Sequence, residues 1–306
     1  MLNKMQRFDD SNGVVSKYVF EAKDAVAEAV LYKYKEDDKL KRVVICCSVM
    51  SGCPVGCTFC GTGKKFVRNL DDVEIRQQIE KILQEQKLTN DFVNQRQSNI
   101  RFQVMFMSMG EPFLNFYDVA HAIQRLHLKY PSAELLISTI APRTLKNHFR
   151  KIPEDFIELS ENIDKVGLQF SIHESTDEKR NQLIPFKDKL TLREIRDFGI
   201  QWSLATHRPV FLNYCVKESN ATEQDKENLM NLFSPVFFNF TFSVICSSDE
   251  TMKDAGFRNL DFIRNFEKDF IKAGYNTRIF DPHGQDDIGG GCGQLWYVQR
   301  WMKEHN

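Results

Sequence analysis

The sequence lacks the features of a membrane or secreted protein. No apolar run reaches the roughly 20 residues that a membrane-spanning helix needs. The start, MLNKMQRFDDSNG, has no apolar segment of a secretory signal. We therefore expect a cytoplasmic protein with no membrane partner. Thiols stay reduced in that compartment, so the eight cysteines predict metal ligands, catalytic groups or core residues rather than a disulfide framework.

The sequence also lacks an excess of charge of either sign. Its 41 Lys and Arg residues offset 42 Asp and Glu residues, which leaves a formal net charge of −1. This weakens the case for a strongly basic nucleic-acid-binding protein, although a local basic patch can persist in a neutral total. A chain of 306 residues with 42% hydrophobic residues is long enough for one large domain or two ordinary ones.

Short runs rich in β-branched and aromatic residues recur along the chain and are typical of buried strands. We expect strands at 41–49, 101–108, 133–139, 165–172, 208–216 and 237–245. Helix-like segments lie between most of them, at 71–87, 116–130, 191–205 and 221–233. A strand followed by a helix, repeated about six times, predicts an α/β fold with a parallel barrel or an open parallel sheet.

Two parts of the chain lie outside this repeat. One is an N-terminal segment with a hairpin at about 14–46, and the other is a C-terminal tail from about 258. We therefore divide the chain into an N-terminal extension (1–40), a barrel core (41–257) and a C-terminal extension (258–306).

Four unusual motifs each follow a predicted strand. They are the cysteine motif of residues 53–60, MGEP (109–112), STIAP (138–142) and SIHES (171–175). Residues at the carboxyl ends of parallel strands form the active face of a barrel, so we expect the four motifs to share one site.

Cys53, Cys57 and Cys60 are crowded into the stretch SGCPVGCTFCGTGKKF. Three thiolates in so short a loop can reach one small inorganic centre, and flanking glycines let the backbone wrap around it. A zinc site usually has a fourth Cys or His, commonly in a second paired motif, and no second pair exists here. The pattern favours a [4Fe–4S] cluster with one iron free of protein ligands, and buried free cysteines are the plainer alternative.

The spacing CxxxCxxC, with an aromatic residue (Phe59) before the last cysteine, resembles the radical S-adenosylmethionine (SAM) superfamily. Five stretches, the first of which contains this motif, resemble in order and spacing the RlmN/Cfr family of radical SAM methyltransferases of adenine in RNA. They are residues 44–70, 109–115, 138–142, 170–186 and 286–295. The resemblance covers about residues 26 to 296. It implies an α/β fold with a partial parallel (β/α)6 radical SAM barrel, an N-terminal hairpin and a C-terminal extension that carries the methyl-accepting cysteine.

The resemblance implies a role for five cysteines. Cys53, Cys57 and Cys60 would hold the [4Fe–4S] cluster, whose open iron binds S-adenosyl-L-methionine. Cys292, in GGGCGQ, would first receive a methyl group from SAM. A radical made from a second SAM would then remove hydrogen from that methyl, and the methylene radical would add to carbon 2 or carbon 8 of adenine. Cys46 would remove the ring proton and form a disulfide with Cys292 to release the product.

Other site residues follow from the same resemblance. SAM would be positioned by Gly110, Glu111, Ser138 and the segment Ser171, Ile172 and His173. A carboxylate such as that of Glu111 can accept an ammonium group, and hydroxyls suit a ribose.

Three further positions bear on these assignments. Cys47 should point to the opposite face of its strand from Cys46, and so into the core. Cys246 or Ser247 stands where the family typically has an asparagine that contacts SAM. Glu28 resembles a family carboxylate, sometimes assigned as a proton acceptor, and the alternative is a solvated hairpin carboxylate.

The substrate is less well specified than the chemistry. The chain begins almost at the hairpin, so we expect it to lack the small N-terminal accessory domain with which family members engage RNA. Phosphates could instead contact basic residues that rim the predicted site, and Phe66 or Phe186 could stack on an extruded base. These basic residues are Lys64, Lys65, Arg68, Lys179, Arg180 and Lys187.

Three hypotheses about function follow. The first is a methyltransferase of ribosomal or transfer RNA, with a reducing partner such as flavodoxin or ferredoxin. The second keeps this chemistry but moves it to a nucleotide or another small substrate. The third is a non-catalytic iron–sulfur or zinc protein, against which the presence of both Cys46 and Cys292 argues.

Overall fold

The computed structural model describes the whole chain except residues 90, 91, 93–99, 147–150, 247–255, 292, 296 and 306 and the side chain of Lys64. Ten strands of the described part form one sheet, in which spatial order follows chain order. They are β1 (Lys4–Asp9), β2 (Val15–Glu21), β3 (Val26–Glu36), β4 (Lys39–Cys47), β7 (Arg101–Phe106), β8 (Glu134–Thr139), β9 (Val166–Ser171), β10 (Val210–Cys215), β11 (Phe238–Ser243) and β12 (Thr277–Phe280).

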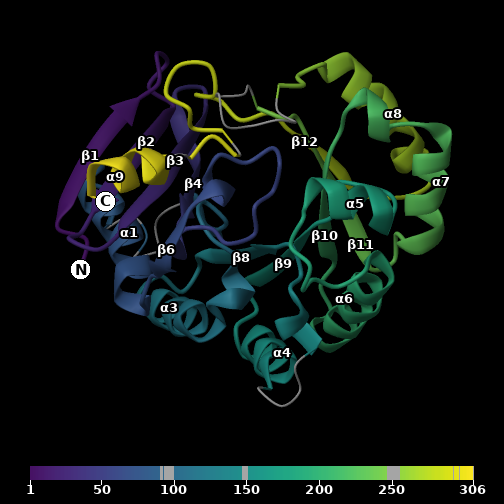
Figure 1. The fold of residues 1–306 in the computed structure, drawn as a ribbon, viewed down its shortest axis with the longest axis horizontal. Coiled ribbons are helices and arrows are strands. Elements are labelled where there is room, and N and C mark those ends of the chain that lie inside the picture. The colour runs from purple at the N-terminus through teal and green to yellow at the C-terminus, as the bar shows by residue number, and fades with distance from the viewer. Residues whose placement is uncertain are drawn as a thin grey trace.

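The sheet changes character at β4. Strands β1 to β4 pair antiparallel with their neighbours, whereas β4 and β7 to β12 all run parallel. The strands follow an arc from β1 to β12, and α3, α4 and α6 lie outside it (Figure 1). The carboxyl ends of the parallel strands therefore meet at one end of a partial barrel.

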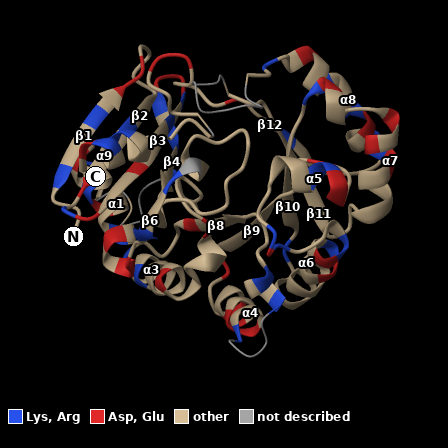
Figure 2. Ribbon diagram, in the orientation of Figure 1, with Lys and Arg blue, Asp and Glu red and all other residues tan. Residues whose placement is uncertain are grey.

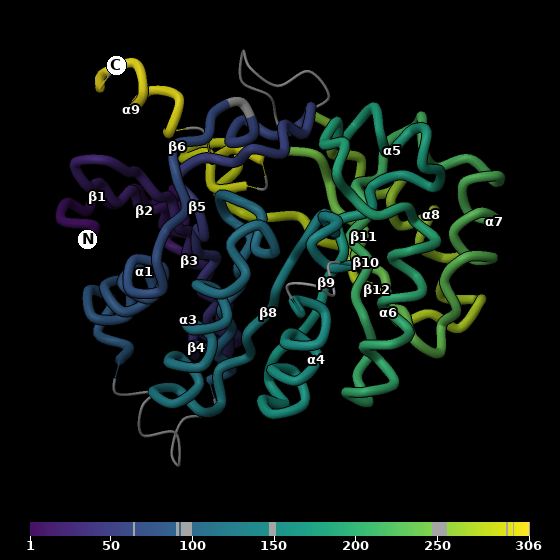
Figure 3. Tube along the Cα trace, turned by 60° about the horizontal axis from the view of Figure 1, so that its bottom comes forward, coloured from purple at the N-terminus to yellow at the C-terminus, as the bar shows by residue number. Residues whose placement is uncertain are grey.

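Helices connect most of the parallel strands and cover the outer face of the sheet. They are α1 (Asp72–Glu85), α3 (Phe116–Lys129), α4 (Ile152–Asn162), α5 (Asp177–Leu183), α6 (Leu192–Thr206), α7 (Glu223–Leu232) and α8 (Leu260–Lys272). Asp71, Thr191 and Thr222 begin three of these helices with reciprocal capping boxes, which satisfy amides of the first turn. A last helix, α9 (Tyr297–His305), lies apart from this layer (Figure 3) and contacts β3.

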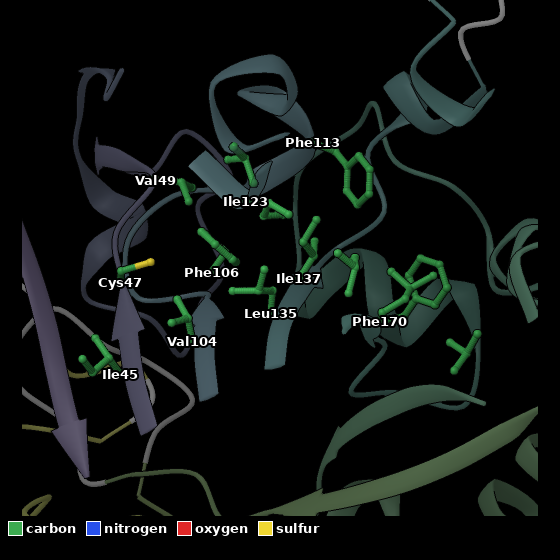
Figure 4. Close-up of a cluster of buried hydrophobic side chains, with 14 of the residues drawn as sticks. Ile45, Cys47, Val49, Val104, Phe106, Phe113, Ile123, Leu135, Ile137 and Phe170 are labelled. Carbon is green, nitrogen blue, oxygen red and sulfur yellow. The ribbon is translucent and has the colours of Figure 1, made fainter. Parts of the chain in front are cut away.

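Alternation along the strands separates a core face from a site face. Ile45 and Cys47 of β4 pack with Val104 and Phe106 of β7 and with Leu135 of β8 in the core (Figure 4). The residues between them point to the inner face of the arc, because successive side chains of a strand alternate. The inner face is therefore available for a site.

The six predicted strands are confirmed as β4 and β7 to β11, and the four predicted helices as α1, α3, α6 and α7. The alternation continues further than expected, because α8 and β12 lie in the C-terminal tail and β12 pairs with β11. Sequence analysis also missed α4, α5 and α9. Within the described residues, no helix is both long enough and apolar enough to cross a membrane.

Candidate active site

The cysteine motif lies in a loop whose base is pinched closed. Two short strands, β5 (Met50–Gly52) and β6 (Phe66–Asn69), pair antiparallel there. Gly52 has φ +78°, and a Cβ at this position would lie 2.1 Å from the carbonyl oxygen of Lys65, so the crossing requires glycine. The amide of Cys53 donates a hydrogen bond of 2.8 Å to the same oxygen. The loop is therefore fixed at its base, just beyond the end of β4.

The three cysteines of this loop, Cys53, Cys57 and Cys60, line one cavity of about 100 Å³. Burial raises the pKa of Cys53 to about 12 and holds the pKa of Cys57 well above its usual range. Both thiols are therefore protonated in the protein alone. A metal centre that bound them would have to displace these protons.

The three cysteines fit an iron–sulfur cluster, in which each thiolate binds a different iron. The Ser108 hydroxyl oxygen also lines the cavity and is buried with no hydrogen-bond partner among the described residues, and a bound ligand would supply one.

Glu111 lines the same cavity, and three protein groups hold its buried carboxylate. Its Oε1 accepts hydrogen bonds from the Thr139 hydroxyl at 2.6 Å and from the Phe113 amide at 3.1 Å, and its Oε2 accepts from the Ile140 amide at 2.8 Å. Burial raises the pKa of Glu111 to about 7, although these donors oppose the rise. A carboxylate has about four acceptor positions, so one remains for a ligand ammonium.

The other residues expected to position SAM divide into two groups. Gly110, Ser138, Ser171 and His173 line the cavity of the three cysteines. Ile172 does not line it, because its side chain is buried in the core.

His173 is held rigidly at the edge of the cavity. It has φ +59°, its Nδ1 accepts a hydrogen bond of 3.2 Å from the Cys215 amide, and its ring meets the edge of Phe59 at 5.2 Å. Burial, and then the charges of Arg180 and Lys217, lowers the pKa of His173 to about 3. The imidazole is therefore neutral, and it offers a ligand hydrogen bonding without charge.

Cys46 and Cys47 point to opposite faces of β4. Cys47 is fully buried in the core beside Phe106 (Figure 4), which confirms its predicted place. Cys46 is half-buried and lines a second cavity, of about 320 Å³, on the inner face of the sheet. Ser108 and Gly293 line both cavities. Cys46 therefore faces a space that adjoins the cavity of the three cysteines.

Cys292 lies outside the described residues, but its two neighbours are described. Gly291 and Gly293 line the larger cavity, and the carbonyl of Gly293 accepts a hydrogen bond of 2.8 Å from the amide of Gly61 in the cysteine loop. Nearby, the Thr62 hydroxyl donates to the carbonyl of Leu295. The chain that follows position 292 is therefore attached to the cysteine loop, and the glycine that precedes it lines the larger cavity.

Cys246 lies against the glycine-rich segment, while Ser247 is outside the described residues. The sulfur of Cys246 is buried, and a Cβ added to Gly291 would lie 2.5 Å from it. Glycine at position 291 thus allows the two segments to approach. Cys246 lines neither of the two cavities described above.

The expectation of a solvated carboxylate at Glu28 is wrong. Glu28 is fully buried, its Oε2 accepts a hydrogen bond of 2.8 Å from the Tyr297 amide, and Lys17 Nζ lies 3.7 Å from its Oε1. Burial raises the pKa of Glu28 to about 7. Helix α9 covers this carboxylate, and sequence analysis did not predict that helix.

Several of the basic residues expected at the rim are already engaged. Arg180 is fully buried and donates to backbone carbonyls, so its predicted contact with phosphate is wrong. Arg68 pairs with Asp24 and Glu74, and Lys179 pairs with Asp225. Lys65 and Lys187 remain exposed, and the side chain of Lys64 is outside the described residues. Figure 2 shows cationic and anionic residues interleaved on α6, α7 and α8.

Sequence analysis missed two polar residues that line both cavities, Ser108 and Asn213. Asn213 interrupts the apolar run of β10, and its Oδ1 accepts a hydrogen bond of 2.6 Å from the Ser243 hydroxyl. A polar residue within an apolar strand was the available signal.

Comparisons with known proteins identify relatives of this chain, although no family model matches it. The chain is 32% identical over 285 residues to the probable dual-specificity RNA methyltransferase RlmN of Pseudothermotoga lettingae. This match covers 92% of the chain and 75% of that protein. The chain is 29% identical to proteins of the same name from Thermotoga petrophila and Thermus thermophilus. These matches cover 95% of the chain and 77% and 76% of the two relatives, respectively.

A solved structure supports the fold independently. The radical SAM methyltransferase of Sphaerobacter thermophilus matches 96% of this chain and 80% of its own, with a TM-score of 0.78 and 22% identity. The expected fold, a parallel α/β barrel with an antiparallel N-terminal part, is thereby confirmed.

Proposed function

We propose that this chain, which belongs to the RlmN family of radical SAM RNA methyltransferases, transfers a methyl group from SAM by way of Cys292 to a ring carbon of adenine in RNA. One observation carries the proposal. The loop of the three cysteines bonds directly to the segment that contains Cys292, through the Gly61 amide and the Gly293 carbonyl at 2.8 Å. A methyl-carrying cysteine and a radical source must lie close together, and this contact supports such an arrangement.

Cys53, Cys57 and Cys60 would hold the cluster, and Glu111 with the hydroxyls of Ser138 and Ser171 would orient SAM. When bound, the cluster supplies the electron with which SAM is cleaved to yield a radical. The protein must keep that radical away from water and from other C–H bonds. The burial of Cys57 and Glu111 supports such a protected site.

Cys292 and Cys46 would perform the covalent chemistry. The thiolate of Cys292 is a good nucleophile toward a sulfonium methyl, and the neighbouring glycines allow close approach. After a radical has removed one hydrogen atom from that methyl group and its carbon has bonded to adenine, the Cys46 thiolate would remove the ring proton. As Cys46 then forms a disulfide with Cys292, the bond between the carbon and Cys292 would break, the carbon would take up the removed proton to become a methyl group, and the unpaired electron would pass to a one-electron acceptor such as oxidised flavodoxin or ferredoxin. The position of Cys46 on the inner-face cavity supports this role.

The reaction would modify carbon 2 of adenine in ribosomal or transfer RNA, with carbon 8 as the alternative. Incubation of the reconstituted enzyme with SAM, a reductant and total RNA, followed by digestion and mass spectrometry, would separate the two methyladenosines. Fractionation of the RNA before digestion would identify the substrate class.

The decisive test does not need the acceptor. The protein is reconstituted with iron and sulfide without oxygen, supplied with SAM that carries a deuterated methyl group and a reductant, and digested for mass spectrometry. We expect label on Cys292 and none in a Cys292→Ala variant. If deoxyadenosine forms while Cys292 stays unlabelled, the methyl-carrier mechanism is wrong. If SAM remains intact although the cluster is present, the protein is a non-catalytic iron–sulfur protein.

A further inference from the structure

The larger cavity joins Cys46 to two arginines that the proposed chemistry does not use. This space of about 320 Å³ on the inner face of the sheet is lined by Cys46, Arg42 and Arg278, among others. Arg42 and Cys46 are four residues apart on β4 and so share one face. At about 3.3 Å per residue, their Cα atoms are about 13 Å apart along the strand. Cavities of several hundred Å³ commonly hold ligands of small-molecule size.

Arg278 on β12 is fixed by neutral partners. Its Nε donates to the Thr241 hydroxyl at 2.7 Å, and one terminal nitrogen donates to Oε1 of Gln169 at 3.2 Å. Its guanidinium also lies 4.9 Å from the centre of the Phe211 ring. These contacts orient the guanidinium and leave its positive charge uncompensated.

Arg42 faces the same cavity with even fewer polar contacts. Its guanidinium stacks 3.9 Å from the centre of the Tyr34 ring, and its Nε is buried with no hydrogen-bond partner in the part of the chain that the structure describes. An unsatisfied buried N–H donor is costly unless a ligand accepts from it. Both guanidiniums are thus held by aromatic rings, with donor capacity to spare.

The charges of the described residues do not balance in this cavity. Neither Arg42 nor Arg278 forms an ion pair with a carboxylate of the described part of the chain. Asp281 also lines the cavity, but it already pairs with Arg258 at 2.9 Å. Partial desolvation, and then the charge of Arg42, lowers the pKa of Arg278, although its side chain remains exposed. Two like charges near one another that solvent can reach favour the binding of an anion.

We propose that Arg42 and Arg278 bind a phosphate group of the methyl acceptor and so place its adenine ring at Cys46. This inference rests on the proposed function, because it assumes that Cys46 acts on the adenine ring. Guanidinium groups bind phosphate oxygens through paired hydrogen bonds, and two of them that line one cavity suit one phosphate. The ligand is an adenine nucleotide, and its phosphate belongs to a free nucleotide or to an RNA strand.

The test measures binding to the full chain without SAM, by calorimetry. We expect adenosine 5′-monophosphate to bind about ten- to a hundredfold more tightly than adenosine, as charge-assisted hydrogen bonds would give. We also expect added salt to weaken the binding of adenosine 5′-monophosphate but not the binding of adenosine. Arg278→Gln should remove most of the difference, and Arg278→Lys should restore part of it. Equal affinities of the two ligands for the wild-type protein would overturn the proposal, and that comparison does not depend on any variant.

A matched control variant and a comparison with RNA complete the experiment. Arg264→Gln on α8 removes an exposed arginine that does not line the cavity and should leave nucleotide affinity unchanged. A short single-stranded RNA with one adenosine is then compared with the mononucleotide. Weaker binding of both to Arg278→Gln assigns the phosphate to RNA, and a loss confined to the mononucleotide assigns it to a free nucleotide. Loss for neither rejects the site. Label on Cys292 in wild-type protein tests the proposed function separately.

Discussion

The amide of Tyr297, at the first residue of α9, donates a hydrogen bond of 2.8 Å to the buried carboxylate of Glu28 on β3. A carboxylate at a helix N-terminus accepts from free amides and faces the positive end of the helix dipole. Lys17 adds a cation 3.7 Å away. Even so, burial raises the pKa of Glu28 to about 7 from an ordinary value of 4.5. The cost of burying the charge therefore exceeds the gain from these partners.

This balance predicts how stability depends on pH. The folded protein keeps a proton on Glu28 at pH values where the unfolded chain has lost it. The stabilisation that comes from the raised pKa of Glu28 is thus complete below about pH 4.5 and is lost as the pH rises through about 7. Between about pH 5 and about pH 8, we expect the free energy of unfolding of the wild type to fall by about 2 to 3 kcal/mol relative to Glu28→Gln. Denaturant unfolding at both pH values measures the difference.

Glu158→Gln is the matched control for this measurement. Glu158 is exposed on α4, so its carboxylate stays in water in both states, and its substitution should leave the pH dependence unchanged. Glu111 contributes equally to the wild type and both variants, and its effect cancels. Parallel pH curves for wild type and Glu28→Gln would show that Glu28 titrates normally in the folded protein.

Glu28 also shows which kind of contact the sequence does not predict. The predicted strands were correct because each is a compact run of β-branched and aromatic residues, and the two faces of Cys46 and Cys47 follow from strand alternation. The carboxylate of Glu28 is buried by a helix that begins 269 residues later in the chain. No local pattern contains that contact, so only the tertiary structure could reveal it.

Two other misses have different physical causes. Helix α8 had a readable signal, since Ile263, Phe266 and Phe270 recur at helical spacing and are buried. In contrast, Arg180 ends the charged run DEKR, a pattern that usually marks a solvated surface. Its burial depends on carbonyls from three separate loops and strand ends, which sequence spacing does not bring together.

The buried position of Arg180 gives a second prediction. Its guanidinium donates to the carbonyls of Leu190 at 2.9 Å, Ile140 at 2.6 Å and Ser171 at 3.5 Å. Burial lowers its pKa to about 10, so it stays charged at neutral pH. Arg180→Met would leave these carbonyls without a donor, and we expect a loss of about 3 kcal/mol in the free energy of unfolding.

Chemical denaturation of Arg180→Met against Arg196→Met makes the comparison specific. Arg196 is on the outer surface of α6, where it pairs with its neighbour Asp197. Its substitution should change stability by less than about 0.5 kcal/mol. Similar values for both variants would mean that the three carbonyl contacts of Arg180 add little to stability.

A third prediction concerns the contact between the cysteine loop and the C-terminal segment. Gly293 has φ +82°, and a Cβ there would lie 2.7 Å from the carbonyl oxygen of Phe59. Gly293→Ala must therefore push the two segments apart. Because small displacements of reacting groups have large effects on rate, we expect labelling of Cys292 by deuterated SAM to slow by at least about tenfold.

Gly274→Ala separates the clash from backbone strain. Gly274 has φ +89°, but no atom of the described residues lies within 4 Å of its added Cβ. Both variants bear the cost of a left-handed residue, about 1 to 2 kcal/mol, and only Gly293→Ala adds the contact with Phe59. Gly274→Ala should label Cys292 at the wild-type rate. Equal labelling by both variants would mean that the spacing between the loop and the segment does not matter.

The last prediction tests the metal ligands against a cysteine of the core. Cys53, Cys57 and Cys60 line the small cavity, whereas Cys47 is buried among apolar side chains of the core. A cluster bound by three cysteines loses a required ligand when any one is replaced. We therefore expect Cys53→Ala, Cys57→Ala and Cys60→Ala each to lose most of their iron and sulfide after anaerobic reconstitution.

Cys47→Ala is the control. It should keep both iron and sulfide but lose about 1 to 2 kcal/mol of stability through a small cavity. Iron and sulfide analysis alongside denaturant unfolding measures the two effects. Iron loss from Cys47→Ala equal to that of the loop variants would attribute the losses to unfolding and remove the support for this ligand set.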